Sequence, residues 1–94
     1  MFLHDKIFQS FADLAQMIRK GDQHIINYFA HALKEWRKAR KLSIRELAAI
    51  SEIDHAMIGK YEQGLTNPTL TTIYRLSQAL DIDSSELIPP KKKA

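Results

Sequence analysis

The chain contains no cysteine, which excludes disulfide bridges and any zinc site built on cysteine ligands. It has only three glycines, at positions 21, 59 and 64, and their spacing forms no loop that could cradle a phosphate. No apolar run approaches the roughly 18 residues needed to span a bilayer. The N-terminus does not resemble a secretory signal either, because His4, Asp5 and Lys6 interrupt its apolar residues and no small-residue cleavage site follows. We therefore expect a cytoplasmic protein.

Most of the chain also lacks an excess of one charge sign. The net charge is +3, but Lys91, Lys92 and Lys93 supply three positive charges by themselves, and residues 22–88 hold eight Lys and Arg against nine Asp and Glu. Six of those eight positive residues crowd one stretch, with only Glu35 among them: Lys34, Arg37, Lys38, Arg40, Lys41 and Arg45. This basic stretch fits contact with a polyanion, and it equally fits a solvated helix end, where Lys and Arg are favoured by the helix dipole.

The segment from residue 42 to residue 88 carries a start or stop signal at almost every joint between short helices. Ser43-Ile44-Arg45-Glu46 has the spacing of a capping box, in which the serine and the glutamate each satisfy a free amide at a helix start. Three further signals follow: an N-cap at Asp54 with a stop at Gly64, an N-cap at Thr69 after Asn67-Pro68, and a second capping-box spacing over 83–86. These signals predict helices over about 43–51, 54–63, 70–80 and 84–88.

Two longer helices are expected before this segment. Apolar residues recur at steps of three and four between residues 2 and 20, which predicts an amphipathic helix: Leu3, Ile7, Phe11, Leu14 and Ile18. After the stop signal Gly21-Asp22, a second helix from about Gln23 to Arg40 directs a further apolar set inward: Ile25, Ile26, Phe29, Leu33 and Trp36. We expect three parts: an amphipathic N-terminal helix over 1–21 that is a candidate for dimerisation, a domain over 22–88, and a basic disordered tail over 89–94.

Residues 43–63 have the pattern helix, tight turn, helix, which is typical of a DNA-reading helix-turn-helix. From Phe29 to Ile88 the chain resembles the lambdoid phage repressor and Cro (XRE-like) family of DNA-binding domains. The matching residues are Leu33, Trp36, Arg37, Leu42, Ser43, Glu46, Leu47, Ala48, Ile53, Ile58, Glu62, Gly64, Asn67, Pro68, Leu70, Ala79, Leu80, Glu86 and Leu87. The resemblance implies an all-α, five-helix repressor-like helix-turn-helix domain, to which the N-terminal amphipathic helix is an addition.

The resemblance makes Asp54–Gln63 the recognition helix and implies base contacts at four positions: His55, Ala56, Gly59 and Lys60. The chemistry of these residues agrees, since a lysine ammonium can donate to guanine O6 and N7, and an alanine can pack on a thymine methyl. His55 can donate to a base or contact a phosphate. Gly59 has no side chain and allows close approach of the backbone. For each of them the alternative is an exposed helix residue without a role in binding.

Contacts to the DNA backbone are expected at the start of the preceding helix and in the loop after the recognition helix. Free amides at a helix N-terminus bind phosphate with help from the helix dipole. The candidate residues are Ser43, Ile44, Arg45, Thr66 and Asn67. The chain departs from the family at Ile44, where many members carry a phosphate-binding glutamine. It departs again at Glu52, where glycine is common, and at Leu65, where lysine or arginine is common. These changes weaken the electrostatic part of binding.

The family also contains an internal ion pair between an arginine of the first helix and a glutamate that ends the recognition helix. Arg37 and Glu62 fall on those two positions. The resemblance therefore implies that this pair ties the first helix to the recognition helix. We expect both residues to be structural and not catalytic.

These observations predict a sequence-specific transcriptional regulator, most simply a repressor that binds a palindromic operator in double-stranded DNA as a homodimer. We expect no enzyme activity and no cofactor, since no serine sits in a nucleophile motif. We expect no metal site, because His24 and His31 lie about 10 Å apart on one helix. For the helix over 2–20, pairing with a second subunit and folding back near Tyr28 and Trp36 both stay open. The alternative function is an antitoxin-like or adaptor module whose N-terminal helix binds a protein partner, and Glu52 and Asp54 favour it.

Overall fold

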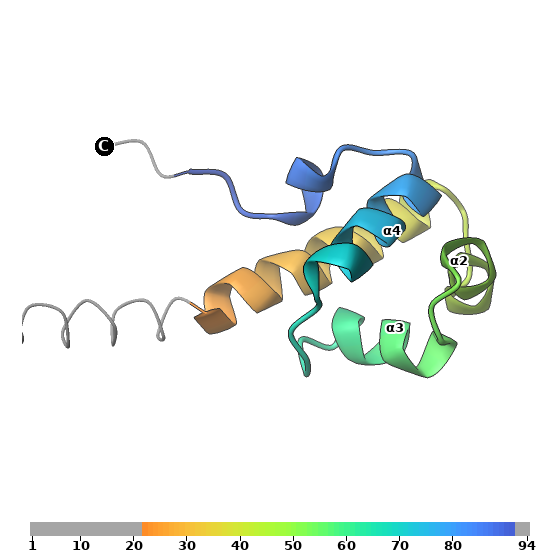
Figure 1. The fold of residues 1–94 in the computed structure, drawn as a ribbon, viewed down its shortest axis with the longest axis horizontal. Coiled ribbons are helices and arrows are strands. Elements are labelled where there is room, and N and C mark those ends of the chain that lie inside the picture. The colour runs from red at the N-terminus through yellow and green to blue at the C-terminus, as the bar shows by residue number, and fades with distance from the viewer. Residues whose placement is uncertain (1–21, 92–94) are drawn as a thin grey trace, which may run out of the picture.

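The computed structural model describes residues 22–91, so the helix expected over 1–21 and the last residues of the tail lie outside it. The described part is all-α (Figure 1). Residues 22–39 are helical and are called the long helix below. After it come α2 (Ile44–Ser51), α3 (His55–Glu62), α4 (Leu70–Leu80) and a single 3-10 turn, η1 (Ser84–Leu87). Within residues 22–91 the fold therefore has four α-helices and a 3-10 turn, where five helices were expected.

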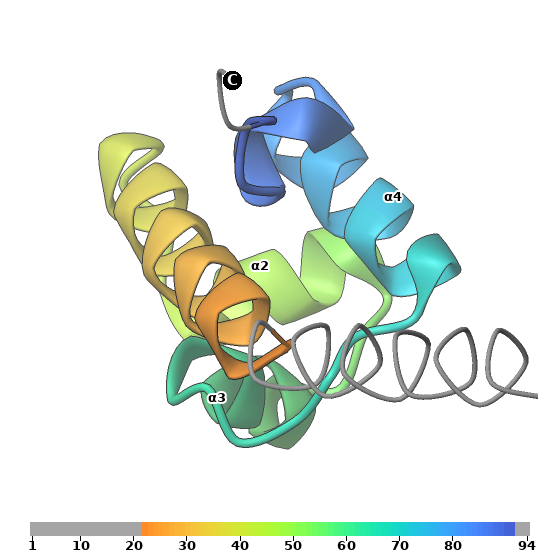
Figure 2. The ribbon, with the colours of Figure 1, turned by 90° about the vertical axis from the view of Figure 1, so that its left-hand side faces the viewer.

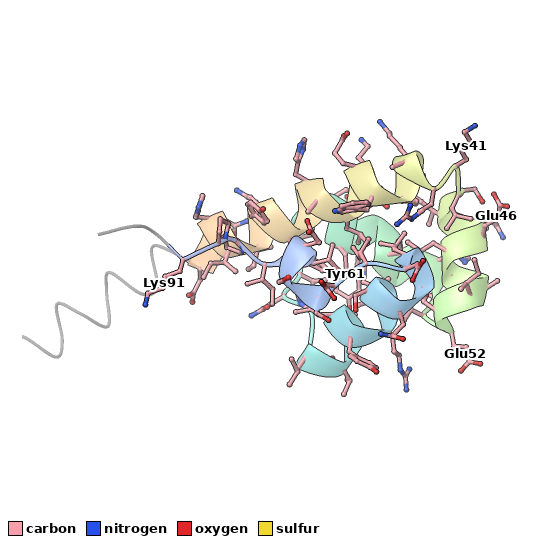
Figure 3. The ribbon with its side chains drawn as sticks, turned by 90° about the horizontal axis from the view of Figure 1, so that it is seen from above. Lys41, Glu46, Glu52, Tyr61 and Lys91 are labelled. Atoms are coloured by element: carbon pink, nitrogen blue, oxygen red, sulfur yellow. The ribbon has the colours of Figure 1, made fainter. Side chains whose placement is uncertain are left out.

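The helices form one small bundle in which α2 packs against both α3 and α4, and η1 packs against α4. The long helix and α4 stand on two sides of α2, and α3 lies along one edge of the bundle (Figure 2). The chain after η1 returns beside the long helix (Figure 1). Lys91 consequently lies at the end of the domain opposite to Lys41, Glu46 and Glu52 (Figure 3).

The core takes residues from the long helix and from each later element. Its buried members are Phe29, Leu33, Leu47, Ile58, Tyr61, Leu76, Leu80 and Leu87. Phe29 and Tyr61 meet edge to face, with ring centroids 5.8 Å apart, and so join the long helix to α3. Ile25 was expected to face inward, but 47% of it is exposed, because the long helix extends past the elements that cover its later turns.

Two of the four expected helix starts are capped as the sequence predicts. The Glu46 amide donates to the Ser43 hydroxyl (3.0 Å) and the Ser43 amide donates to the Glu46 carboxylate (2.9 Å), which completes the capping box. The Thr72 amide donates to the Thr69 hydroxyl at the start of α4. These two caps are local, since donor and acceptor are only three residues apart.

The other two starts use a backbone acceptor in place of the expected side chain. Asp54 precedes α3, but its carboxylate accepts no capping bond, and the Met57 amide donates to the Asp54 carbonyl instead. The Asp83–Glu86 spacing is likewise not a capping box, because the Glu86 amide donates to the Asp83 carbonyl (2.9 Å). That i to i+3 backbone bond is the bond of a 3-10 turn, which explains why no α-helix forms there.

The four α-helices between residues 22 and 91 all end in one way, with a residue in the left-handed conformation followed by an aliphatic residue. The left-handed residues are Lys41 (φ 59°), Glu52 (φ 58°), Gly64 (φ 71°) and Asp81 (φ 55°). The amide of each following aliphatic residue donates to the carbonyl five residues before it: Leu42 to Arg37, Ile53 to Ala48, Leu65 to Lys60 and Ile82 to Ser77. This six-to-one bond defines the Schellman motif. Only Gly64 is the residue type that the motif prefers.

Replacing Glu52 by glycine should stabilise the fold. A residue with a Cβ pays about 1–2 kcal/mol in the left-handed conformation, and the greater freedom of glycine in the unfolded chain offsets part of that gain. We expect Glu52→Gly to raise the free energy of unfolding by about 1 kcal/mol in urea titrations. The control is Glu52→Ala, which also removes the charge but keeps the strain. An equal gain in both variants would contradict the explanation.

Candidate nucleic-acid interface

The outward face of α3 carries all four residues that the sequence assigns to base contacts. Ile58 and Tyr61 of this helix are buried in the core, so its opposite side is turned to solvent. On that side lie His55, Ala56 and Lys60, which are exposed, and Gly59, which is half-buried. The spacing i, i+1, i+4, i+5 brings the four together on one strip of the helix surface.

Packing within the described domain does not require a glycine at position 59. A Cβ added there would meet no atom within 4 Å. In a helix interior a glycine is less favourable than an alanine by about 1 kcal/mol. A side chain at this position would therefore be restricted only by whatever lies against the outer face of α3.

Negative charge surrounds the first residue of α3. His55 Nδ1 lies 3.8 Å from Asp54 Oδ1, which is too long for a hydrogen bond, and both side chains are well exposed. Glu52 is exposed two residues earlier. The His55 ring is thus free to turn toward a ligand, while Asp54 and Glu52 oppose the approach of an anion.

The start of α2 offers two free amides. The capping box uses the amides of Ser43 and Glu46, and no acceptor for those of Ile44 and Arg45 is found among residues 22–91. The hydrogen bonds from the Ser43 amide and hydroxyl lower the pKa of the Glu46 carboxyl, so the box is intact at neutral pH. Both polar groups of Ser43 are thus engaged in the capping box, the amide with the Glu46 carboxylate and the hydroxyl with the Glu46 amide and carboxylate.

The turn after α3 packs against the first residues of the long helix. Gln23 Nε2 donates to the Gly64 carbonyl (3.3 Å) and to Asn27 Oδ1 (2.8 Å). A Cβ on Gly64 would stand 2.9 Å from Asn27 Oδ1, so the backbone approaches the long helix closely here. Beyond this contact, Thr66 is half-buried and Asn67 is exposed. Gln23 and Asn27 were not predicted as site residues, because the contact joins residues 41 apart and no local sequence pattern indicates it.

Arg37 and Glu62 form a two-pronged ion pair between the long helix and the end of α3. Arg37 Nε donates to Glu62 Oε2 (2.6 Å) and Nη2 donates to Oε1 (2.9 Å). The third guanidinium nitrogen, Nη1, donates to the Leu42 carbonyl (2.9 Å). The side chains are only 12% and 6% exposed, and the bonds to Glu62 raise the pKa of Arg37. The Arg37 guanidinium is therefore not available to a phosphate.

Arg40 is engaged in the fold as well. Its Nε donates to the Leu80 carbonyl (2.7 Å) and its Nη2 to the Asp81 carbonyl (3.1 Å), which caps the end of α4. The guanidinium also lies 5.4 Å from the centre of the Trp36 ring. Two of the six residues of the basic stretch therefore bond within the fold, the largely buried Arg37 and the exposed Arg40, and the other four are exposed: Lys34, Lys38, Lys41 and Arg45.

Neither a metal centre nor a membrane span is found in the described part of the chain. Among residues 22–91 no three acidic or histidine side chains gather closely enough to hold a metal ion. No helix in that range is long and apolar enough to cross a bilayer. His24 and His31 are both exposed on the long helix.

Comparison with known proteins assigns the family. Residues 33–87 match the helix-turn-helix family HTH_3. The chain belongs to this family. The resemblance to XRE and Cro-type domains is thereby confirmed. The transcriptional regulator SutR of Escherichia coli is 26% identical over 72 residues, which cover 77% of this chain and 40% of SutR. The chain thus spans less than half the length of this curated relative.

Two solved structures that resemble this fold come from proteins with different printed roles, a controller protein and an enzyme. The restriction-modification controller protein C.AhdI of Aeromonas hydrophila is 38% identical, with a TM-score of 0.65, and the match covers 67% of this chain and 96% of that protein. Hydroxypropylphosphonic acid epoxidase of S. wedmorenis is 27% identical, also with a TM-score of 0.65, but the match covers 70% of this chain and 35% of the enzyme. The fold alone therefore does not decide the function.

Removing one partner of the Arg37–Glu62 pair should destabilise this HTH_3 domain strongly. Arg37→Met would strand a largely buried carboxylate, and we expect a loss of about 3 kcal/mol in the free energy of unfolding. The double variant Arg37→Met/Glu62→Met should lose clearly less than the sum of the two single variants. Lys38→Met, an exposed neighbour, is the control and should change stability by less than about 0.5 kcal/mol. Additive losses in the double variant would mean that the pair is not coupled.

Proposed function

We propose that this chain is a sequence-specific DNA-binding transcriptional regulator, most simply a repressor, that presents α3 to the major groove. The observation that carries the proposal is the outward face of α3, a strip of small and donor-bearing residues on a helix whose other side is buried. The names of SutR, a transcriptional regulator, and C.AhdI, a controller protein, support it. Since the match covers 96% of C.AhdI, a domain of this kind can form nearly the whole of a controller.

Base recognition is assigned to four residues of α3. The Lys60 ammonium would donate to guanine O6 or N7, and His55 to a base acceptor or a phosphate. Ala56 would contact a thymine methyl, and Gly59 would let the helix backbone come close to the base edges. The open space around Gly59 supports the last assignment, because nothing within the described domain explains a glycine there.

Phosphate contacts are assigned to two places that flank α3. At the start of α2, the free amides of Ile44 and Arg45 and the Arg45 guanidinium would hold one phosphate, and the Ser43 hydroxyl would join them by turning its proton away from Glu46. In the turn after α3, Thr66 and Asn67 would hold another through neutral donors. The DNA-binding domain in this proposal spans 22–88, followed by the basic tail over 89–94.

The operator in this proposal is palindromic and the regulator is a homodimer. One α3 covers a half-site only, and two half-sites related by a two-fold axis lie about 34 Å apart or a multiple of that distance. We assign pairing of the subunits to residues 2–20, whose apolar positions recur with helical spacing. On the described surface, the other candidate is the depression between Tyr28 and Ile88, which are 37% and 41% exposed.

One observation favours a second function, that of an antitoxin-like or adaptor module with a protein partner. Leu65 and Leu70, which flank the turn after α3, are 69% and 79% exposed. Leucines at this place give a DNA backbone nothing to bond to, whereas a protein surface can bury them. The two functions are not exclusive, since one chain can bind DNA and a partner.

Selection from a randomised pool of duplexes at about 150 mM salt tests the proposed function. We expect the protein to enrich an inverted repeat, and we expect His55→Ala/Lys60→Ala to lose that enrichment while keeping its fold by circular dichroism. Lys34→Ala, which removes an exposed lysine of the long helix, is the control and should keep the same repeat. Retention of DNA without enrichment would reduce the protein to a non-specific binder. If the protein retained no DNA at all, the result would contradict DNA binding and favour the protein-interaction module.

Truncation tests the assignment of the dimer surface. A chain that starts at Asp22 should sediment as a monomer at concentrations where the full chain is a dimer, because the proposed pairing helices are missing. The domain itself should stay folded, since the eight buried core residues of the described part, from Phe29 to Leu87, pack against one another. A truncated chain that is still dimeric would refute pairing through residues 2–20. Tyr28→Arg in that chain would then test the Tyr28–Ile88 depression.

A further inference from the structure

The long helix contacts α3 and the turn after α3 at two separate points. The Arg37–Glu62 pair holds the last residue of α3 itself. The Gln23 amide holds the turn beyond it, through the Gly64 carbonyl, and Asn27 Oδ1 orients that amide. Gln23 and Asn27 both precede residue 33, where the family match begins, so the second point is a feature of this chain beyond the matched region.

The second contact controls where the backbone goes after α3. Gly64 is left-handed with a φ of 71°, and the Leu65 amide donates back to the Lys60 carbonyl, so the chain reverses within two residues. The Gly64 carbonyl accepts a hydrogen bond from Gln23 Nε2. The Gly64 Cα lies so close to Asn27 that an added Cβ would stand 2.9 Å from Asn27 Oδ1. Thr66 and Asn67 follow directly. The packing of the turn on the long helix therefore sets the position of Thr66 and Asn67 relative to α3.

We infer that Gln23 and Asn27 are positioning residues for the phosphate contact of Thr66 and Asn67. The inference rests on the proposed function, because it needs DNA to lie against α3. Gln23 and Asn27 do not have to touch DNA themselves. They keep the turn against the long helix, so that its neutral donors meet a phosphate at the same time as α3 enters the groove. Without them the turn loses its hydrogen bond to the long helix, and the phosphate contact is made by a smaller share of the molecules.

The test compares Gln23→Met with Gln78→Met on the duplex that the selection enriches. Methionine matches glutamine in length and helix propensity but cannot donate, and Gln78 is an exposed glutamine of α4. We expect Gln23→Met to bind roughly two- to tenfold more weakly, the loss of about one hydrogen bond, and Gln78→Met to bind as the unmodified protein does. Asn27→Ala should behave like Gln23→Met.

Ethylation interference distinguishes positioning from a general loss of stability. We expect one phosphate to stop interfering in Gln23→Met, the same phosphate that stops interfering in Asn67→Ala. The phosphates at the start of α2 and the preferred base sequence should not change. Uniform weakening at every phosphate together with a lower Tm would show a structural role only and overturn the inference. Unchanged affinity and footprint in Gln23→Met would overturn it too and leave the proposed function standing. If the unmodified protein enriches no duplex, the proposed function fails first and the inference falls with it.

Discussion

The Arg37 guanidinium is the group on which the rest of the arrangement depends, because it contacts three parts of the chain at once. It projects from the long helix, clasps the Glu62 carboxylate at the end of α3 with two bonds, and gives a third to the Leu42 carbonyl just before α2. Paired charges that are largely out of water interact more strongly than exposed ones, and a two-pronged bond fixes orientation as well as distance. The edge-to-face contact of Phe29 with Tyr61 adds an apolar support to the same pair of helices. A helix that reads base edges has to present its outer face at a fixed angle, and these contacts supply that rigidity to α3.

The use of Arg37 and Arg40 inside the fold changes how the charge of the chain bears on DNA binding. Arg40 caps the carbonyls at the end of α4 and lies near Trp36, so both guanidinium groups are held by contacts within the fold. Lys60 is exposed in the last turn of α3, while two acidic residues, Glu52 and Asp54, are exposed before its first turn. Phosphate neutralisation is the part of binding that depends on salt and not on sequence. Under the proposed function that part is small near α3, and the neutral donors around α3 would carry a correspondingly larger share of the binding.

The sequence predicted those features that arise within a few residues and missed those that join distant segments. The capping box of Ser43 and the cap at Thr69 were predicted because donor and acceptor lie in one turn. The resemblance supplied the Arg37–Glu62 pair, which no local pattern shows. The left-handed helix ends at Lys41 and Asp81 were not foreseen, since neither is a glycine and the following aliphatic residue is drawn in by the core. The bonds of Arg40 and Gln23 span 40 and 41 residues, and only the assembled fold brings those partners together.

The contrast between two glycines connects the fold to the proposed function. Gly64 is explained from within the domain, because its φ is 71° and Asn27 leaves no space for a Cβ. Gly59 is not explained in this way, since it is helical and, among residues 22–91, no atom outside its own helix backbone would lie within 4 Å of an added Cβ. A glycine in mid-helix is unfavourable by about 1 kcal/mol relative to alanine, so a chain adapted for stability alone would carry alanine there. The benefit that offsets this cost then lies outside the domain, against the outer face of α3. Close approach of the α3 backbone to the floor of a major groove would be such a benefit. Ala56 and Lys60 flank Gly59 on this face of the helix and would contact the same groove.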